Sequence, residues 1–231
     1  MDLSGIGRYF FNGEVMLKAL PLLASGLVMT LKVSCVVIGI GFGVGLILAL
    51  IRTGTAKTRV VGKVVGFLIR LYVDLLRASP YLVLLSFVYF GLPFLGVNLS
   101  TFWATVITFS ACLSAFAEET FRAGIEAIDR GQWEAARSLG LSFFDTMRHI
   151  ILPQAIRISI PALTNWTVAI TKAISMASAI ALPDLLKQAR WAQGIFANPS
   201  PLIEAAVIYV LLFFPLVKLT LFLERKWGKL V

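Results

Sequence analysis

The sequence predicts an all-α integral membrane protein with five transmembrane helices. Of its 231 residues, 58% are hydrophobic and only 14% are charged, and the mean hydropathy is +0.88. A soluble domain carries about a quarter charged residues, so this chain has too little polar surface to cover a globule in water. Apolar stretches long enough to cross about 30 Å of hydrocarbon as helices recur along it. We place them at about residues 27–51, 75–95, 101–117, 161–182 and 202–223.

The chain before the first span differs from the spans themselves. Residues 1–26 mix apolar and polar groups, and we interpret them as an N-terminal arm at the membrane interface that is helical in part. The span that follows is apolar except for Lys32, which lies near one end and can reach the headgroups. Alternate positions from Gly39 to Gly45 are glycine, and small residues at four-residue spacing let helix backbones approach. We therefore expect this span to pack tightly against another membrane helix.

The connections between the other spans differ in polarity. Pro80, near the start of the second span, suits an early helical position. The linker 91–100 contains no charge, whereas the region 118–160 between the third and fourth spans is long and polar. A connection over 183–201 leads to the fifth span. Together the residues 1–231 are expected to form a single transmembrane domain.

Basic residues collect in alternate connections. Five Lys or Arg residues lie in 52–70, which we interpret as a loop, five lie in 118–160 and three follow the fifth span. The opposite connections hold none and two. Because cytoplasmic loops are rich in Lys and Arg, the N-terminus is predicted outside and the C-terminus in the cytoplasm. This distribution accounts for the net charge of +9 without nucleic-acid binding, which would favour a single basic stripe.

The stretch from Glu134 to Pro153, EAARSLGLSFFDTMRHIILP, predicts a helix, a turn and a second helix on the cytoplasmic side. It opens with strong helix formers, and Gly140 suits the left-handed residue just past a helix end. Ser142 can cap the next helix, with Asp145 three residues on completing a capping box. That helix is expected to stop before Pro153, which lacks an N–H.

The second helix of this stretch has an apolar face. Phe143, Phe144, Met147 and Ile150 or Ile151 recur at three- and four-residue spacing. Two interpretations are open. The face either packs on the protein's own membrane helices or enters a groove of a soluble partner.

These residues resemble a known motif. Glu134-Ala135-Ala136, then Gly140, then Ile150-x-Leu152-Pro153 resembles the EAA motif of ABC importer permeases, with every defining position at the family's spacing. The similarity extends over most of residues 20–225, and three further segments resemble the polar-amino-acid permease subfamily. They are Asp74–Pro80, similar to V-E-L-F-R-G-T-P, Ala117–Ile125, similar to A-E-I-x-R-G-G-I, and Gly131–Glu134, similar to K-G-Q-W-E.

The resemblance implies a mechanical role. In such importers the helix pair, called the coupling helix, docks in a cleft of a cytoplasmic ATPase, and ATP-driven closure of two ATPases moves the paired permeases between inward- and outward-facing states. The residues to which this role is carried over are Glu134, Ala135, Ala136, Gly140, Phe143, Phe144, Ile150, Leu152 and Pro153.

Partners and location follow from the same resemblance. It implies two ATPase subunits that hold ATP and Mg²⁺, a second permease, identical or homologous, and a substrate-binding protein outside. It also implies a multi-pass protein of the bacterial inner membrane that binds no cofactor itself. The sequence leaves open which amino acid or analogue is carried and whether the second permease is identical.

Ionisable residues inside spans are candidates for the substrate path, because burying them is costly. Glu118 lies at the inner end of the third span and Lys172 within the fourth. Asn165, Thr171 and Ser175 could add hydrogen bonds. Lys172 could instead form a structural pair with Glu118 or contact helix-end carbonyls. The subfamily often reads K-D-T-S-L where this chain reads KAISM from Lys172, so the acid is missing.

Other functions are less consistent with the residues. Gly54–Thr58 reads GTAKT, and Ala56 stands where a phosphate loop needs Gly before the Lys. No catalytic constellation or metal-ligand spacing is predicted, and Cys35 and Cys112 lie in apolar runs. A membrane enzyme is therefore disfavoured. The alternative transporter class, an ion-gradient-driven secondary transporter or channel subunit, is disfavoured because five spans without an internal repeat supply only one half of such a protein.

Overall fold

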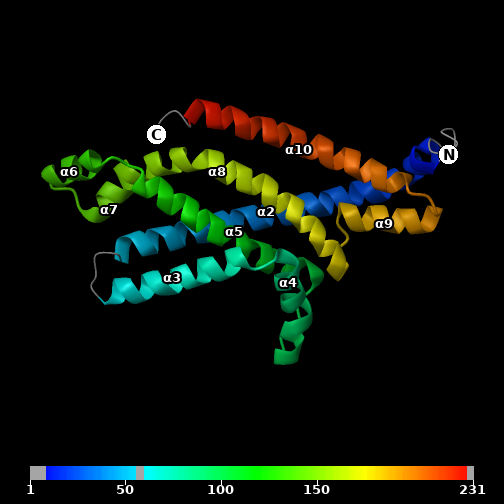
Figure 1. Ribbon diagram of the computed structural model, residues 1–231, viewed down its shortest axis with the longest axis horizontal. Coiled ribbons are helices and arrows are strands. Elements are labelled where there is room, and N and C mark those ends of the chain that lie inside the picture. The colour runs from blue at the N-terminus through cyan, green and yellow to red at the C-terminus, as the bar shows by residue number, and fades with distance from the viewer. Residues whose placement is uncertain (1–8, 56–59, 228–231) are drawn as a thin grey trace. The chain divides into compact units, whose positions relative to one another are not determined.

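The computed structural model describes residues 9–55 and 60–227, and within these ranges every regular element is a helix, which confirms the all-helical prediction. Residues 1–8 of the predicted arm, and Lys57, Arg59 and Lys229 of the predicted basic segments, lie outside the described residues. In chain order (Figure 1) the elements are α2 (Gly13–Thr55), α3 (Val61–Ala78), α4 (Tyr81–Ser86), the π-helix η1 (Phe87–Gly91), the 3₁₀-helix η2 (Leu92–Leu95), α5 (Thr101–Glu126), α6 (Arg130–Ser138), α7 (Phe143–Thr146), the π-helix η3 (Met147–Ile151), α8 (Leu152–Ala173), the 3₁₀-helix η4 (Ile174–Ile180), α9 (Leu185–Phe196) and α10 (Ser200–Trp227).

Three helices, α2, α5 and α10, are each long and apolar enough to cross a membrane. Two more spans arise if each of two bent helix pairs counts as one. These pairs are Val61–Ala78 with Tyr81–Leu95, bent by 103°, and Phe143–Ile180 with Leu185–Phe196, bent by 47°. The described chain therefore holds three to five candidate spans, and the upper number equals the five that the sequence predicts.

Helix α2 begins earlier than the first predicted span. Asn12 precedes it, and the Asn12 Oδ1 atom accepts hydrogen bonds from the backbone N–H groups of Glu14 (3.1 Å) and Val15 (3.2 Å). An Asn cap of this kind satisfies donors that a helix start otherwise leaves free. One turn further along the helix, the Lys18 Nζ atom lies 2.6 Å from the Glu14 carboxylate. Residues 13–26, predicted as part of an arm, are thus the first turns of a 43-residue helix.

The predicted basic loop 52–70 is in large part helical. Helix α3 begins at Val61, where apolar and basic side chains alternate at helical spacing, and Gly62, Ile69 and Val73 are buried on one face. Lys63 and Arg70 therefore lie on an amphipathic helix, and Arg52 lies in the last turn of α2. Charge alone suggests a loop here, whereas the spacing of the apolar residues indicates a helix.

The predicted second span 75–95 is broken near its start. Ser79 is extended (φ −87°, ψ 136°), as the residue before a proline usually is. Pro80 lies just before α4 rather than inside it, and its carbonyl accepts from the N–H groups of Val83 (3.1 Å) and Leu84 (3.2 Å). The 103° bend between α3 and the following helices occurs at this Ser-Pro step.

Contacts divide the chain into two compact units, each assembled from separate stretches of sequence, where the sequence predicts one domain. Unit 1 comprises Met1–Val37, Pro80–Phe109 and Ala169–Leu216. Its core lies where α2, α9 and α10 meet, and Leu23, Leu185 and Ala205 are buried together there. The Thr30 hydroxyl oxygen accepts a hydrogen bond from the Leu185 N–H at 3.1 Å, which ties the start of α9 to α2.

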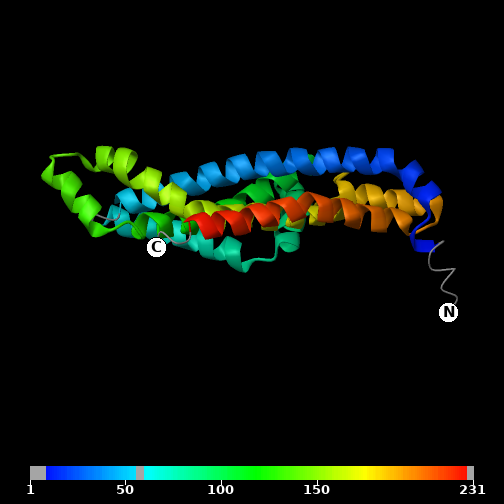
Figure 2. The same ribbon diagram turned by 90° about the horizontal axis from the view of Figure 1, so that it is seen from above.

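Unit 2 comprises Ile38–Ser79, Ser110–Val168 and Val217–Val231. A Cβ atom placed on Gly41 would lie 2.8 Å from Leu113, and one on Gly45 would lie 2.6 Å from the Ala117 Cβ. These close approaches confirm the expected glycine-mediated packing, here of α2 against α5. Figures 1 and 2 show α6 and α7 as a helical hairpin at one end of this unit.

Candidate functional site

The first helix of the hairpin carries the Glu-Ala-Ala sequence. Its start is capped by Asp129, whose carboxylate accepts from the Gly131 N–H at 2.7 Å. Glu134 and Ala135 are exposed, whereas Ala136 is buried with 1% of its surface accessible. The motif therefore presents its first two residues outward and anchors the hairpin through the third.

The turn after α6 has the predicted geometry. Gly140 has φ +74°, in the left-handed region that side chains disfavour. Its N–H bonds the Arg137 carbonyl at 3.0 Å, and the Leu141 N–H bonds the Ala136 carbonyl at 3.1 Å. This pair of bonds is a Schellman motif, which satisfies the last carbonyls of the helix.

The second helix begins at the predicted cap. The Ser142 hydroxyl oxygen accepts from the Asp145 N–H at 3.1 Å, and the hydroxyl donates to the Asp145 carboxylate at 2.5 Å. The expected capping box would have used the Ser142 backbone N–H instead. The carboxylate thus closes on the capping side chain, and the helix start is fixed all the same.

The helix does not stop before Pro153, and this prediction is wrong. α7, η3 and α8 run on without a break, with Pro153 in the first turn of α8. A prolyl ring normally collides with the carbonyl four residues back. Here η3 widens the helix, and the Leu152 N–H bonds the Met147 carbonyl five residues back. The π-turn just ahead of the proline therefore carries the chain past it.

The apolar face of the second helix divides between the two interpretations. Met147 and Ile151 are buried in a cluster with Ile125, Ile128 and Ala155, so these two pack on the protein itself. In contrast, Phe144 is 67% exposed and Leu139, beside the turn, is 78% exposed. The tip of the hairpin is therefore apolar and uncovered in the isolated chain.

A hollow of about 560 Å³ lies beside this tip. It is lined by Thr53, Arg130, Trp133, Glu134, Arg137, Leu141, Phe143 and Thr146. The rings of Trp133 and Phe143 stack there, with centroids 6.0 Å apart and planes 20° apart. Of the remaining motif residues, Ile150 and Leu152 are half-buried and Pro153 is exposed. The hollow is thus bordered by a stacked aromatic pair, two arginines and one glutamate.

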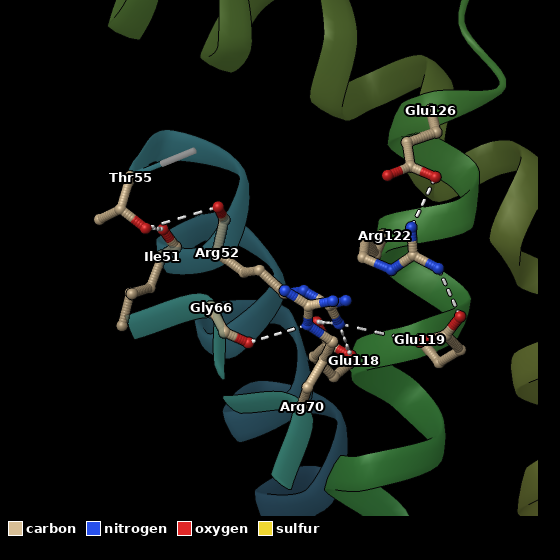
Figure 3. Close-up of polar contacts among 9 residues, drawn as sticks. All are labelled: Ile51, Arg52, Thr55, Gly66, Arg70, Glu118, Glu119, Arg122 and Glu126. Carbon is tan, nitrogen blue, oxygen red and sulfur yellow. Dashed lines mark hydrogen bonds and ion pairs between the residues drawn. The ribbon is translucent and has the colours of Figure 1, made fainter. Parts of the chain in front are cut away.

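Glu118 of the predicted substrate path is completely buried and has a partner, Arg52, that the sequence did not reveal (Figure 3). Arg52 Nη1 lies 3.0 Å from one carboxylate oxygen of Glu118 and 3.3 Å from the other. Arg122 bonds Glu119 and also lies 2.6 Å from Glu126. Charge pairs thus follow α5 toward the hairpin.

Lys172 and Ser175 lie together in unit 1 around a smaller hollow. This hollow, of about 260 Å³, is lined by Lys172, Ser175, Tyr209 and Phe213. The Lys172 ammonium lies 5.3 Å from the centroid of the Phe213 ring, a cation–π contact. Thr171 is buried, with 4% of its surface accessible, and Asn165 is exposed on α8. Lys172 and Ser175 are therefore the predicted path residues that the structure brings together.

Sequence reasoning missed the partners rather than the candidates. Arg52 is one of several basic residues in the predicted loop, and Tyr209 and Phe213 lie in an apolar span, so nothing in the sequence distinguishes them. The i, i+3 and i+4 spacing of Glu119, Arg122 and Glu126 could have indicated ion pairs along one helix face. No local pattern indicates that Arg52 meets Glu118, 66 residues on.

Comparison with known proteins agrees with this architecture. Residues 41–229 match the family described as "Binding-protein-dependent transport system inner membrane component". The chain is 37% identical over 203 residues to "Probable amino-acid ABC transporter permease protein YckA" of Bacillus subtilis (strain 168), covering 87% of each. It is 35% identical over 209 residues to "Arginine transport system permease protein ArtQ" of the same organism, covering 90% of this chain and 93% of that one.

A solved structure is similar over nearly the same length. The "Crystal structure of an amino acid ABC transporter with histidines" contains a chain with a TM-score of 0.80 and 37% identity, covering 91% of this chain and 96% of that one. The helical fold and its candidate spans are those of a multi-pass transport component of a bacterial inner membrane, not of an enzyme. The protein belongs to the family of inner membrane components of binding-protein-dependent transport systems.

Proposed function

We propose that this chain is the permease of an ABC importer that takes up a polar amino acid or a related compound. The observation that carries the proposal is the hairpin of Glu134–Pro153, whose uncovered apolar tip lies on a chain of this family. The names of the similar permeases, an arginine system and an amino-acid system among them, support the substrate class. ATP and Mg²⁺ would be held by a partner ATPase.

The uptake test uses proteoliposomes that contain the permease with its ATPase and its substrate-binding protein. Accumulation of a labelled amino acid is expected only when ATP and Mg²⁺ are present on the ATPase side. Accumulation by the permease alone, driven by an ion gradient, would instead identify a secondary transporter or channel. The panel of labelled compounds would begin with L-arginine, L-glutamine and L-cystine. A system that carries no amino acid at all would refute the proposed substrate class.

In this proposal the hairpin transmits movement from the ATPase. Leu139 and Phe144 supply the exposed apolar contact, Glu134 lies beside it, and Met147 and Ile151 anchor the hairpin to the membrane helices. The N-terminus is placed outside and the hairpin and C-terminus in the cytoplasm, in accordance with the distribution of basic residues. Two ATPases, a second permease and an external binding protein complete the complex.

The hollow around Lys172 is proposed as part of the substrate path. The Lys172 ammonium, held over the Phe213 ring, is placed to meet a carboxylate. A Lys172→Gln variant should raise the KM for uptake about tenfold or more, because a hydrogen bond to a charged group is lost. The matched control is Lys218→Gln, which replaces another exposed lysine, this one on α10 in the predicted fifth span. This variant should leave KM unchanged. An unchanged KM in Lys172→Gln would remove this residue from the path.

A further inference from the structure

A second hollow in unit 2, of about 410 Å³, is separate from the hollow beside the hairpin tip and shares only Glu119 with the charge pairs along α5. It lies among α3, α5 and α8, and its most informative lining residues are Arg77, Phe116, Glu119, Thr120, Ser159 and Trp166. Small-molecule sites typically measure roughly 300–1,000 Å³ and combine an apolar lining with a few placed polar groups. The volume and the lining of this hollow both fall within that description.

One wall of the hollow is a stacked aromatic pair. The rings of Phe116 and Trp166 have centroids 4.0 Å apart and planes 28° apart. The guanidinium carbon of Arg77 lies 5.5 Å from the Phe116 centroid, so a cation–π contact holds the arginine against this wall. Three side chains from three helices therefore fix each other before any ligand arrives.

Two opposite charges lie at the same hollow. Among the described residues, no carboxylate lies within ion-pair distance of the Arg77 guanidinium. The Oε1 atom of Glu119 bonds Arg122, but its Oε2 atom is 3.9 Å from Arg52, too far for a hydrogen bond. The Glu119 side chain remains 35% exposed. The hollow thus offers a cation and a carboxylate oxygen that each retain bonding capacity.

The floor of the hollow is closed by tight packing of α5 on α8. The Ser159 hydroxyl donates to the Thr120 carbonyl at 3.3 Å. A Cβ on Gly124 would lie 2.9 Å from the Ala155 carbonyl oxygen, so only glycine permits this approach. A ligand is therefore confined to the side where Arg77, Glu119 and the aromatic wall lie.

We propose that this hollow is a transit site for a free α-amino acid inside the permease, distinct from the hollow around Lys172. Arg77 would bind the α-carboxylate, Glu119 would bind the α-ammonium, and the Phe116–Trp166 wall would hold the side chain. The assignment rests on the proposed function, that this chain carries amino acids. A phosphatidylethanolamine headgroup brings the same two charges, and the experiment separates the two sources.

The test measures binding to the permease–ATPase complex in phosphatidylglycerol nanodiscs, without ATP and without binding protein. Scintillation proximity reports tritiated L-glutamine, L-arginine or L-cystine, with the α-amide and the deaminated acid of each as competitors. Arg77→Gln and Glu119→Gln should each weaken binding about tenfold to a hundredfold, because each removes a charged hydrogen bond. Arg77→Gln should in addition lose the wild-type preference over the amide, and Glu119→Gln the preference over the deaminated acid.

Matched controls lie on the same helices. Arg70→Gln on α3 removes an arginine that bonds the Gly66 carbonyl away from the hollow. Glu126→Gln on α5 removes the other carboxylate that pairs with Arg122. Both should bind like the wild type. Size-exclusion profiles and ATPase rates of all four variants establish that the complex is assembled.

Several outcomes overturn the transit site while leaving the proposed function intact. They are unchanged binding by Arg77→Gln and Glu119→Gln, equal losses for all ligand forms, or no binding to a wild-type complex that still takes up amino acids in proteoliposomes. Native mass spectrometry that finds phosphatidylethanolamine retained by the wild type, lost from both variants and not displaced by amino acid, identifies a lipid site instead. A wild-type complex that takes up no amino acid in proteoliposomes would instead refute the proposed function.

Discussion

Replacing Arg52 by Met should lower the free energy of unfolding by about 3–5 kcal/mol, because it leaves a buried carboxylate without its cation. The Glu118 side chain has 0% accessible surface, and Arg52 donates to both of its oxygens at 3.0 and 3.3 Å. Glu118→Gln should cost less, about 0.5–1.5 kcal/mol, since the amide oxygen still accepts from Arg52. The Arg52 side chain is 18% exposed, and its Nη1 atom also lies 3.9 Å from the Oε2 atom of Glu119.

The assay is a denaturant titration of the purified protein in mixed micelles, followed by far-ultraviolet circular dichroism at neutral pH. The double variant Arg52→Met/Glu118→Leu should recover most of the stability lost in Arg52→Met, because it removes the charge that was left buried. An Arg52→Met variant as stable as Glu118→Gln would refute the reasoning. It would mean that a buried carboxylate without its cation costs no more than a neutral amide at the same position.

Two further predictions concern packing. Met147→Ala should lower the free energy of unfolding by about 2–5 kcal/mol, whereas Phe144→Ala, at a position 67% exposed, should change it by no more than about 0.5 kcal/mol; equal losses in the same titration would contradict the division of the apolar face. Gly45→Val should prevent α2 from packing on α5, because its Cβ would lie 2.6 Å from Ala117. Gly43→Val, where a Cβ meets nothing within 4 Å, carries the same helix-propensity change and should leave the yield of monodisperse protein unaltered.

Local chemistry predicted the hairpin well. The left-handed position at Gly140 and the cap at Ser142 depend on a few neighbouring residues, so the sequence contains what decides them. The helical membrane fold class was also predictable, because it follows from a shortage of charged residues and from apolar runs of transmembrane length. The glycine approach of α2 to α5 was also predictable in kind, although its partner helix was not.

Boundaries and long-range pairs were not predictable in the same way. The early start of α2 depends on Asn12 as a cap, and the passage through Pro153 depends on a π-turn that only the whole hydrogen-bond pattern reveals. The Arg52–Glu118 pair and the hollow between Arg77 and Trp166 join residues distant in sequence. Helix packing brings these side chains together, and neither composition nor residue spacing indicates which of them will meet.

The most direct test of the proposed coupling is the uptake rate of two variants at one residue. Gly140 has φ +74°, and a Cβ added there would meet nothing within 4 Å, so within this chain a substitution acts through backbone strain. Gly140→Asn, a residue that tolerates this conformation, should keep most of the ATP-driven uptake in proteoliposomes. Gly140→Val should lower uptake at least about tenfold while the permease remains in the membrane, since a β-branched residue is strained by about 1–3 kcal/mol there and displaces the hairpin tip. Wild-type uptake by Gly140→Val would contradict the account.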